Sequence, residues 1–93
     1  MIMTSTQELI VAECDAIKTM LLDKNKKYGD SAIKPINIFA KGISNEAQIK
    51  VRLDDKINRL VQGSADEDED VEQDLIGYLV LLRVARKVNK SLK

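Results

Sequence analysis

Five consecutive residues, Lys27-Tyr28-Gly29-Asp30-Ser31, bring together an ammonium group, an aromatic ring, a flexible glycine, a carboxylate and a hydroxyl. A tight turn needs the glycine and a short polar neighbour, but it does not need a tyrosine, and this chain has only three aromatic residues. Lys24 and Lys26 come just before the run. Backbone N–H groups near a glycine, a hydroxyl and ammonium groups can together bind an anion. The run therefore predicts an anion site, with a nucleotide phosphate as the first candidate.

One more side chain extends this candidate site, and Tyr28 within it has two possible roles. Asn37 follows in the same connecting segment and adds an amide. Tyr28 could stack on a nucleobase, or it could cover the core beside Phe39. The alternative for the whole region from Lys24 to Ser31 is a capped helix end with solvated lysines.

An acidic stretch from Asp66 to Asp74 contains seven acidic residues and no basic one. Within it, Asp70 and Asp74 are one helical turn apart and would share a face, and Gly77 leaves room beside them. Asp74 also borders an apolar stripe, where a carboxylate needs a cation, a metal ion or several donors. Hard cations such as Mg²⁺ bind carboxylate oxygens. The stretch predicts a Mg²⁺ site, the alternative being that its acids only cap and solvate a helix start.

A third group, Arg52, Asp55, Lys56 and Arg59, follows spacings of three and four residues. Such spacing can mean surface salt bridges, worth about 0.2–0.5 kcal/mol each. It can also mean that Asp55 faces the acidic pair from a second helix, since facing helices commonly supply metal ligands in bundles. Lys56 and Arg59 would then reach phosphate oxygens, and Arg52 would belong to the same nucleotide site.

Composition restricts the chemistry further. The chain has no histidine and a single cysteine, Cys14. This excludes histidine triads, histidine or cysteine-rich zinc sites and an intramolecular disulfide. We expect Cys14 to lie buried on the apolar face of the first helix. Any catalysis must use carboxylates, lysines and a hard metal ion.

Charge and hydropathy indicate the type of partner. Fifteen basic residues balance fifteen acidic ones, and this argues against non-specific nucleic-acid binding, which needs a basic domain. The longest apolar run, residues 79–82, is too short to span a membrane. We therefore expect a soluble, cytoplasmic protein that binds neither nucleic acid nor membrane.

Hydrophobic periodicity predicts three helices. The first covers residues 5 to about 25, with Ser5 and Glu8 as a capping box, and Gly29 ends it. The second covers residues 45–62, begins at Ser44 or Asn45 as the cap and ends at Gly63. The third starts near Asp66 to Asp68 and continues to about residue 90 as the most buried element.

The elements together predict an all-α fold in one domain, residues 1–93. It is a small bundle of three main helices plus a short helical turn at residues 35–39, which is pinned on the core by its apolar side chains. Because aromatic residues are scarce, the core must be aliphatic. A bundle this small gains much by burying a second face, so we expect a homo-oligomer.

Four motifs in this order resemble a phage and prophage family called nucleotide modification associated domain 1. That family looks like a relative of the all-α nucleoside triphosphate pyrophosphohydrolases, the MazG and dimeric dUTPase group. The similarity covers residues 8 to 86. The motifs are Lys24-Asn25-x-x-Tyr28-Gly29-Asp30-Ser31, Pro35-Ile36-Asn37-Ile38-Phe39, Arg52-Leu53-Asp54-Asp55-Lys56-Ile57-x-Arg59-Leu60 and Glu69-Asp70-Val71-x-x-Asp74-Leu75-Ile76-Gly77-Tyr78.

The resemblance implies a MazG-like, oligomeric helical bundle in a bacterial host cell, binding a nucleotide with Mg²⁺ held by Asp55, Asp70 and Asp74. The acidic residues depart from the pairs of the wider group, Glu-x-x-Glu followed by Glu-x-x-Asp. Three functions therefore stay open. The chain could cleave a nucleoside triphosphate between its α- and β-phosphates, sequester a nucleotide or nucleotide signal without cleavage, or serve as a helical interaction module.

Overall fold

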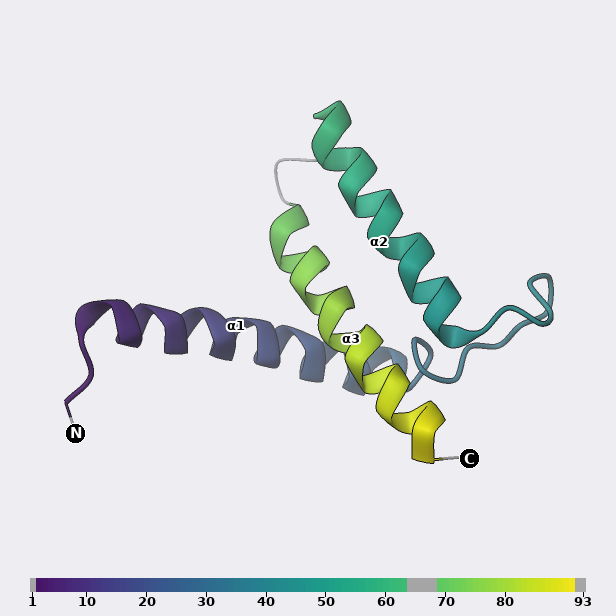
Figure 1. Cartoon of the computed structure of the whole chain (residues 1–93), viewed down its shortest axis with the longest axis horizontal. Helices are drawn as coiled ribbons and strands as arrows, with labels where there is room; N and C mark the ends of the chain where they lie inside the picture. Colours follow the sequence, from purple (N-terminus) through teal and green to yellow (C-terminus); the bar gives the residue numbers. More distant parts are fainter. Residues whose placement is uncertain (1, 64–68, 92–93) are drawn as a thin grey trace.

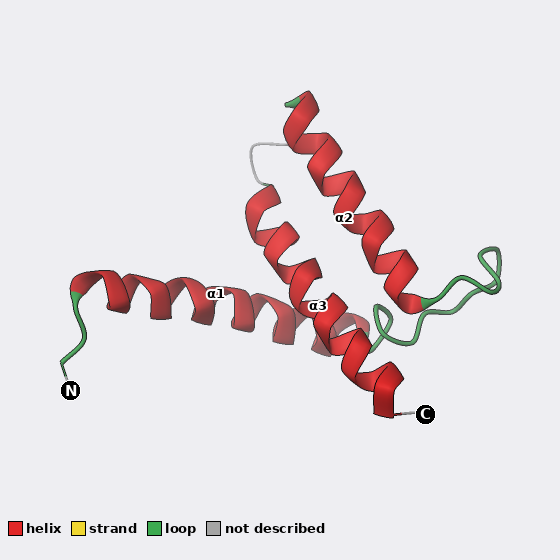
Figure 2. Ribbon diagram, in the orientation of Figure 1, coloured by secondary structure: helices red, strands yellow, loops and turns green. Residues whose placement is uncertain are grey.

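Three helices make up a computed structural model of the chain, which describes residues 2–63 and 69–91 (Figure 1). They are α1 (Ser5–Tyr28), α2 (Asn45–Gln62) and α3 (Val71–Ser91). Among the described residues there is no strand (Figure 2). The predicted all-α bundle of three main helices is confirmed, and the bounds of α2 are those that the sequence predicted.

The core lies between α2 and α3, which run side by side as an antiparallel pair (Figure 1). Its buried centre is Ile49 of α2 with Leu82 and Ala85 of α3. Partly buried side chains pack around this centre: Ile33, Leu53, Tyr78 and Leu81. Helix α3 has more buried residues than α1 or α2, as predicted.

The C-terminal half of α1 crosses α3 near Gly77, while its N-terminal half projects away (Figure 1). None of its 24 residues is buried. The prediction of a buried Cys14 is therefore wrong, since this residue is exposed. Its neighbours on the expected apolar stripe, Leu9 and Ile10, are 68% and 57% exposed. The stripe exists, but within residues 2–63 and 69–91 of one copy nothing buries its first half.

The ends of the helices follow their capping residues. Thr4 caps α1 and its hydroxyl accepts a hydrogen bond from the Gln7 N–H, while the Gln7 side chain accepts one from the Thr4 N–H. This capping box lies one residue before the predicted Ser5–Glu8 pair. Helix α1 also continues three residues beyond the predicted end, to Tyr28, and stops at Gly29, whose φ of 67° favours glycine.

The start of α2 and the end of α3 are joined by side-chain amides. Asn89 donates to Asn45 Oδ1 at 2.8 Å and to a carboxylate oxygen of Glu46 at 3.0 Å. Asn45 donates in turn to the Ile33 carbonyl at 2.8 Å. The connection between α1 and α2 is thereby attached to both helices.

The rest of that connection differs from the prediction. The turn falls at residues 30–34, where the N–H groups of Ile33 and Lys34 bond to the Asp30 carbonyl. Residues 35–39 form no helical turn. Their apolar side chains do not reach the core either, since Ile36 is 88% exposed and Phe39 is fully exposed.

Helix α3 starts later than predicted, at Val71. Asp70 precedes it, accepting a bond from the Gln73 N–H through its carboxylate and one from the Asp74 N–H through its carbonyl. The predicted start at Asp66 to Asp68 lies outside the described residues. No helix in the described ranges is long and apolar enough to cross a membrane.

Leu82 tests where the core lies. We expect Leu82→Ala to lower the free energy of unfolding by about 2–5 kcal/mol, because it opens a cavity at a 6% exposed position. Leu79→Ala, on the same helix at a half-exposed position, should cost less than about 1 kcal/mol. Urea unfolding followed by circular dichroism measures both. Equal losses would contradict the placement of the core.

Candidate functional site

A cavity of about 290 Å³ lies between the last turns of α1, the turn after it, and α3. Its floor is apolar and includes Met20, Leu21 and Leu81. Polar and aromatic groups line the rest: Lys24, Asn25, Tyr28, Asp30, Ser31, Asp74 and Tyr78. Four of the five residues of the run with which the sequence analysis began, Tyr28 to Ser31, therefore form one wall of this cavity.

Asn25 holds this wall in place. The three extra residues of α1 put Asn25 one turn before Gly29, so that its side-chain amide can bond across the helix end. The amide donates to the Gly29 carbonyl at 3.3 Å and to Asp30 Oδ1 at 2.8 Å. Asp30 is thereby fixed at the cavity rim, where its second oxygen remains available to a ligand.

Gly77 sets how closely α1 approaches α3. A Cβ atom built at this position would lie 3.0 Å from Met20 Cε and 3.3 Å from Leu21 Cδ2. The sequence analysis expected Gly77 to leave room beside the carboxylates, and it does line the cavity one turn after Asp74. The absence of a side chain lets the two helices meet while Asp74 still faces the cavity.

Asp74 is the innermost charge of the cavity, with 19% of its side chain exposed. Its Oδ1 lies 3.7 Å from Lys24 Nζ, on the cavity side. Its Oδ2 lies 3.0 Å from Lys56 Nζ, which comes from α2. One carboxylate therefore connects all three helices.

Lys56 is shared by two carboxylates. Besides Asp74, its ammonium lies 2.8 Å from Glu69 Oε1. The side chains of Lys56 and Glu69 are only 15% and 13% exposed. Arg59 bonds to the same oxygen of Glu69. These four side chains form an ion cluster that ties α2 to the start of α3.

The ion cluster shifts the pKa values of its members. The hydrogen bond from Lys56, followed by that from Arg59, lowers the pKa of Glu69 below its usual 4.5, against the opposing effect of burial. The hydrogen bond to Glu69 and then the bond to Asp74 raise the pKa of Lys56 above 10.5, again against burial. Both shifts favour the charged forms at neutral pH.

The three predicted metal ligands do not gather around one point. Asp70 caps α3 and Asp55 is exposed on α2. No group of three or more acidic or cysteine side chains in the described residues could hold a metal ion. The two carboxylates that do converge, Glu69 and Asp74, have the Lys56 ammonium between them. In this arrangement the described residues do not form a site that fits Mg²⁺. Mg²⁺ binding therefore stays a prediction.

Five predicted site residues line the cavity: Lys24, Tyr28, Asp30, Ser31 and Asp74. The other predicted nucleotide ligands lie elsewhere. Lys56 and Arg59 bind Glu69, and Arg52 is exposed on α2. Asn37 accepts a bond from Gln48 of α2 at 3.0 Å and donates to the Ile43 carbonyl, within its own connection, at 3.4 Å. The Lys27 ammonium lies 5.3 Å from the centre of the Tyr28 ring.

Three residues of the region were not predicted to have these roles. Asn25 orders the turn, Tyr78 adds a second aromatic ring, and Glu69 pairs with Lys56. Tyr78 stands four residues after Asp74, so helical spacing alone could have placed it beside the carboxylate. The pairing of Glu69 has no local signal, because it depends on how α2 faces α3.

Comparison of the chain with protein-family models, with curated proteins and with solved structures gave no significant match.

The ion cluster predicts a specific pH dependence. A lowered carboxyl pKa gives stability that is present above pH 4.5 and lost as the pH falls through the folded-state pKa of Glu69. A raised ammonium pKa gives stability that is present below pH 10.5 and lost as the pH rises through the folded-state pKa of Lys56. We expect Lys56→Met to lower the melting temperature at neutral pH and to flatten its fall below pH 4.5.

Melting curves from about pH 3 to about pH 8 measure this change. Arg52→Met is the matched control, since Arg52 makes no ion pair within residues 2–63 and 69–91. The bond from Asn89 is the main cause that lowers the pKa of Glu46. Glu46 therefore contributes to the fall of the melting temperature at acid pH, which we call the acid limb, in the wild type and in both variants. An unchanged acid limb in Lys56→Met would show that the cluster does not stabilise the fold.

Proposed function

We propose that this chain binds a nucleotide in the cavity between α1 and α3. The observation that carries the proposal is the gathering of an ammonium, two aromatic rings and a hydroxyl around one apolar-floored cavity. Small-molecule sites are typically concave and mostly apolar, with a few convergent polar groups. The motif Lys24-Asn25-x-x-Tyr28-Gly29-Asp30-Ser31, on which the family resemblance partly rests, supplies most of these groups.

The size of the cavity suits part of a nucleotide. Its volume of about 290 Å³ lies at the small end of ligand sites, which hold about 300–1,000 Å³. In the proposed complex, the base enters beside Tyr28 and Tyr78, because aromatic rings can stack on a base. Asp30 and Ser31 offer acceptors and a donor to ribose hydroxyls. The phosphates remain at the open rim.

Lys24 is the residue proposed to bind phosphate. Its ammonium is the only cation that lines the cavity in the described residues, and its side chain is 56% exposed. The 3.7 Å contact with Asp74 orients the Lys24 ammonium. The exposure of the side chain lets the ammonium also reach an anion. Two carboxylates line the same cavity, so a phosphate group has to stay on the Lys24 side.

Binding without cleavage is the form of this function that the ion cluster favours. Cleavage between phosphates in the MazG-like group would need a metal ion, which supplies a hydroxide when bound. Here the Lys56 ammonium pairs with both Asp74 and Glu69, and Arg59 pairs with Glu69 as well. A nucleotide-sequestering protein, as an anti-defence protein of a phage would be, needs no such metal. Pyrophosphohydrolase activity remains the alternative. It requires the Lys56 ammonium to leave Asp74 and Glu69 so that a metal ion can take its place.

The proposal includes two further features. The protein acts as a homo-oligomer, because so little of α1 is covered in one copy. It works in the cytoplasm of a bacterial host, as the resemblance to phage and prophage proteins implies. If no nucleotide binds, the remaining proposal is that the chain serves as a helical interaction module.

Nucleotide binding is tested with a panel of ribo- and deoxyribonucleoside triphosphates, monophosphates and nucleosides, with and without Mg²⁺. We expect at least one to raise the melting temperature, because a ligand of the folded state stabilises it. Lys24→Met should weaken that binding by about tenfold or more in calorimetry, since hydrogen bonds to charged groups contribute about 1.5–3 kcal/mol.

Lys26→Met is the control for this variant, because Lys26 has the same charge, lies on the same helix and does not line the cavity. Equal weakening by both variants would point to general charge attraction instead of a site at Lys24. If no compound of the panel binds the wild-type protein, the proposal fails and the interaction module is favoured.

Cleavage is tested separately by following pyrophosphate release with Mg²⁺. We expect none from the wild-type protein with the nucleotide that binds it, because the Lys56 ammonium already neutralises Asp74. Release that is lost in Asp74→Asn would instead establish the enzyme. Retained release in that variant would indicate a contaminating hydrolase.

A further inference from the structure

A second hollow, which we call the apolar groove, lies on the other side of the α1–α3 crossing. It has a volume of about 890 Å³. Its walls are Cys14, Ile17 and Leu22 of α1 and Ile76, Val80 and Val84 of α3. None of these three α3 side chains belongs to the buried core, and Val80 and Val84 are 38% and 40% exposed.

The chain exposes far more surface than a compact monomer of its size. Its accessible surface is 7665 Å², whereas a folded monomer of 10.4 kDa exposes about 5,400 Å². Its radius of gyration is 15.5 Å, against about 12 Å for a compact domain of 93 residues. The excess of about 2,300 Å² exceeds the roughly 800 Å² that each partner buries in a standard interface.

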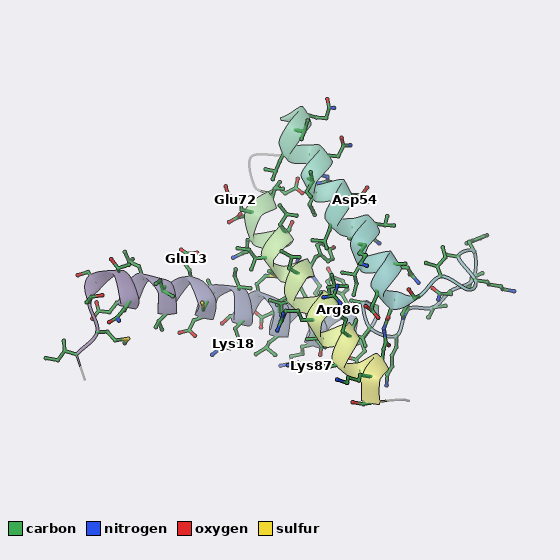
Figure 3. All side chains as sticks on the ribbon, viewed as in Figure 1. Glu13, Lys18, Asp54, Glu72, Arg86 and Lys87 are labelled. Carbon is green, nitrogen blue, oxygen red and sulfur yellow. The ribbon has the colours of Figure 1, made fainter. Side chains whose placement is uncertain are left out.

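The N-terminal half of α1 projects from α2 and α3 (Figure 3), and its residues Glu13 and Cys14 line the groove. Leu9, Ile10 and Val11 are 68%, 57% and 43% exposed there. The helix has 24 residues and is therefore about 36 Å long, so its projecting half is long enough to lie along a neighbouring helix.

The groove is lined by charged residues of both signs, Glu13 and Asp30 with Lys18 and Lys34. The projecting half of α1 carries Glu8, Glu13 and Asp15 and no basic residue before Lys18. The C-terminal part of α3, which forms one side of the apolar groove, carries only basic charges, among them Arg83 and Lys87. Arg83 and Lys87 do not line the groove, so the fit of the projecting half rests on its apolar side chains.

We propose that the apolar groove of each copy receives the projecting half of α1 from a second copy of this chain. The contact is reciprocal, as a two-fold dimer requires, because each copy has both the groove and the helix that fills it. A second copy is the occupant that supplies an exposed apolar helix together with the uncovered area that a standard interface needs. This inference rests on the proposed self-association and not on nucleotide binding.

Light scattering after size-exclusion chromatography, with dilution, tests the contact. We expect the wild-type protein to be a dimer. Ile10→Glu should raise the dimer dissociation constant by about tenfold for each of the two symmetric contacts, about a hundredfold in all, because burying one large aliphatic side chain contributes about 1.5–3 kcal/mol. Val51→Glu is the matched control, since Val51 is also 57% exposed but lies on α2.

These outcomes distinguish the proposed contact in the groove from self-association in general. A wild-type protein that stays monomeric overturns both self-association and the use of the groove, and it leaves the groove for a different protein. A wild-type dimer that Ile10→Glu does not weaken keeps self-association and overturns the groove. Equal weakening by Val51→Glu also overturns the groove as the interface.

The thiol of Cys14 gives a second readout that needs no variant. Cys14 is exposed in a single copy and lines the groove. We expect its rate of reaction with a soluble thiol reagent to fall as the wild-type protein is concentrated, because the second copy covers it. A rate that does not change between dilute and concentrated protein would overturn the proposed contact. In Ile10→Glu, the rate should be high throughout.

Discussion

Everything in this fold depends on α3 contacting the other two helices with different faces. Toward α2 it presents Leu82 and Ala85, which are buried, and toward α1 it presents Gly77, which has no side chain. The first contact is an aliphatic core and the second is a close backbone approach. The cavity exists because Gly77 lets α1 come near while Asp74, one turn earlier, keeps a polar group at the same surface.

The ion cluster shows how a carboxylate pair can be satisfied without a metal. Glu69 and Asp74 converge on one ammonium, and burial around them makes an unpaired charge costly. A lysine on a long flexible stem supplies the charge and comes from α2, so the same contact also fixes the start of α3. A divalent ion at this place would have to displace Lys56, leaving its ammonium in need of a new partner.

Local signals in the sequence predicted the local structure well. Ser44 and Gly63 delimit α2 because a cap and a left-handed glycine act within one turn. Gly29 ended α1 as expected, but Asn25 is what sustains its last turn, and that bond was not predicted. The run from Lys27 to Ser31 was singled out from its residue types alone, and its last four residues line a cavity together with Asp74.

Predictions that needed the arrangement of helices were less successful. An apolar stripe shows which face of α1 avoids water but not whether one copy has anything to cover it, and so Cys14 was misplaced. The apolar residues around Phe39 suggested a turn on the core, yet the turn formed at Asp30, where backbone bonds were available. Lys56 was predicted to bind phosphate, because nothing near it in the sequence indicates Glu69.

The unequal contacts of α3 also order the assembly of the molecule. Helices α2 and α3 are close in sequence, so their pairing closes a short loop and should form early. Helix α1 must then dock across a long connection, and it contacts α3 less extensively than α2 does. The cavity is complete only after that last step. A small molecule that binds in the complete cavity stabilises the state in which α1 is docked. Occupancy of the cavity and attachment of α1 are therefore thermodynamically linked.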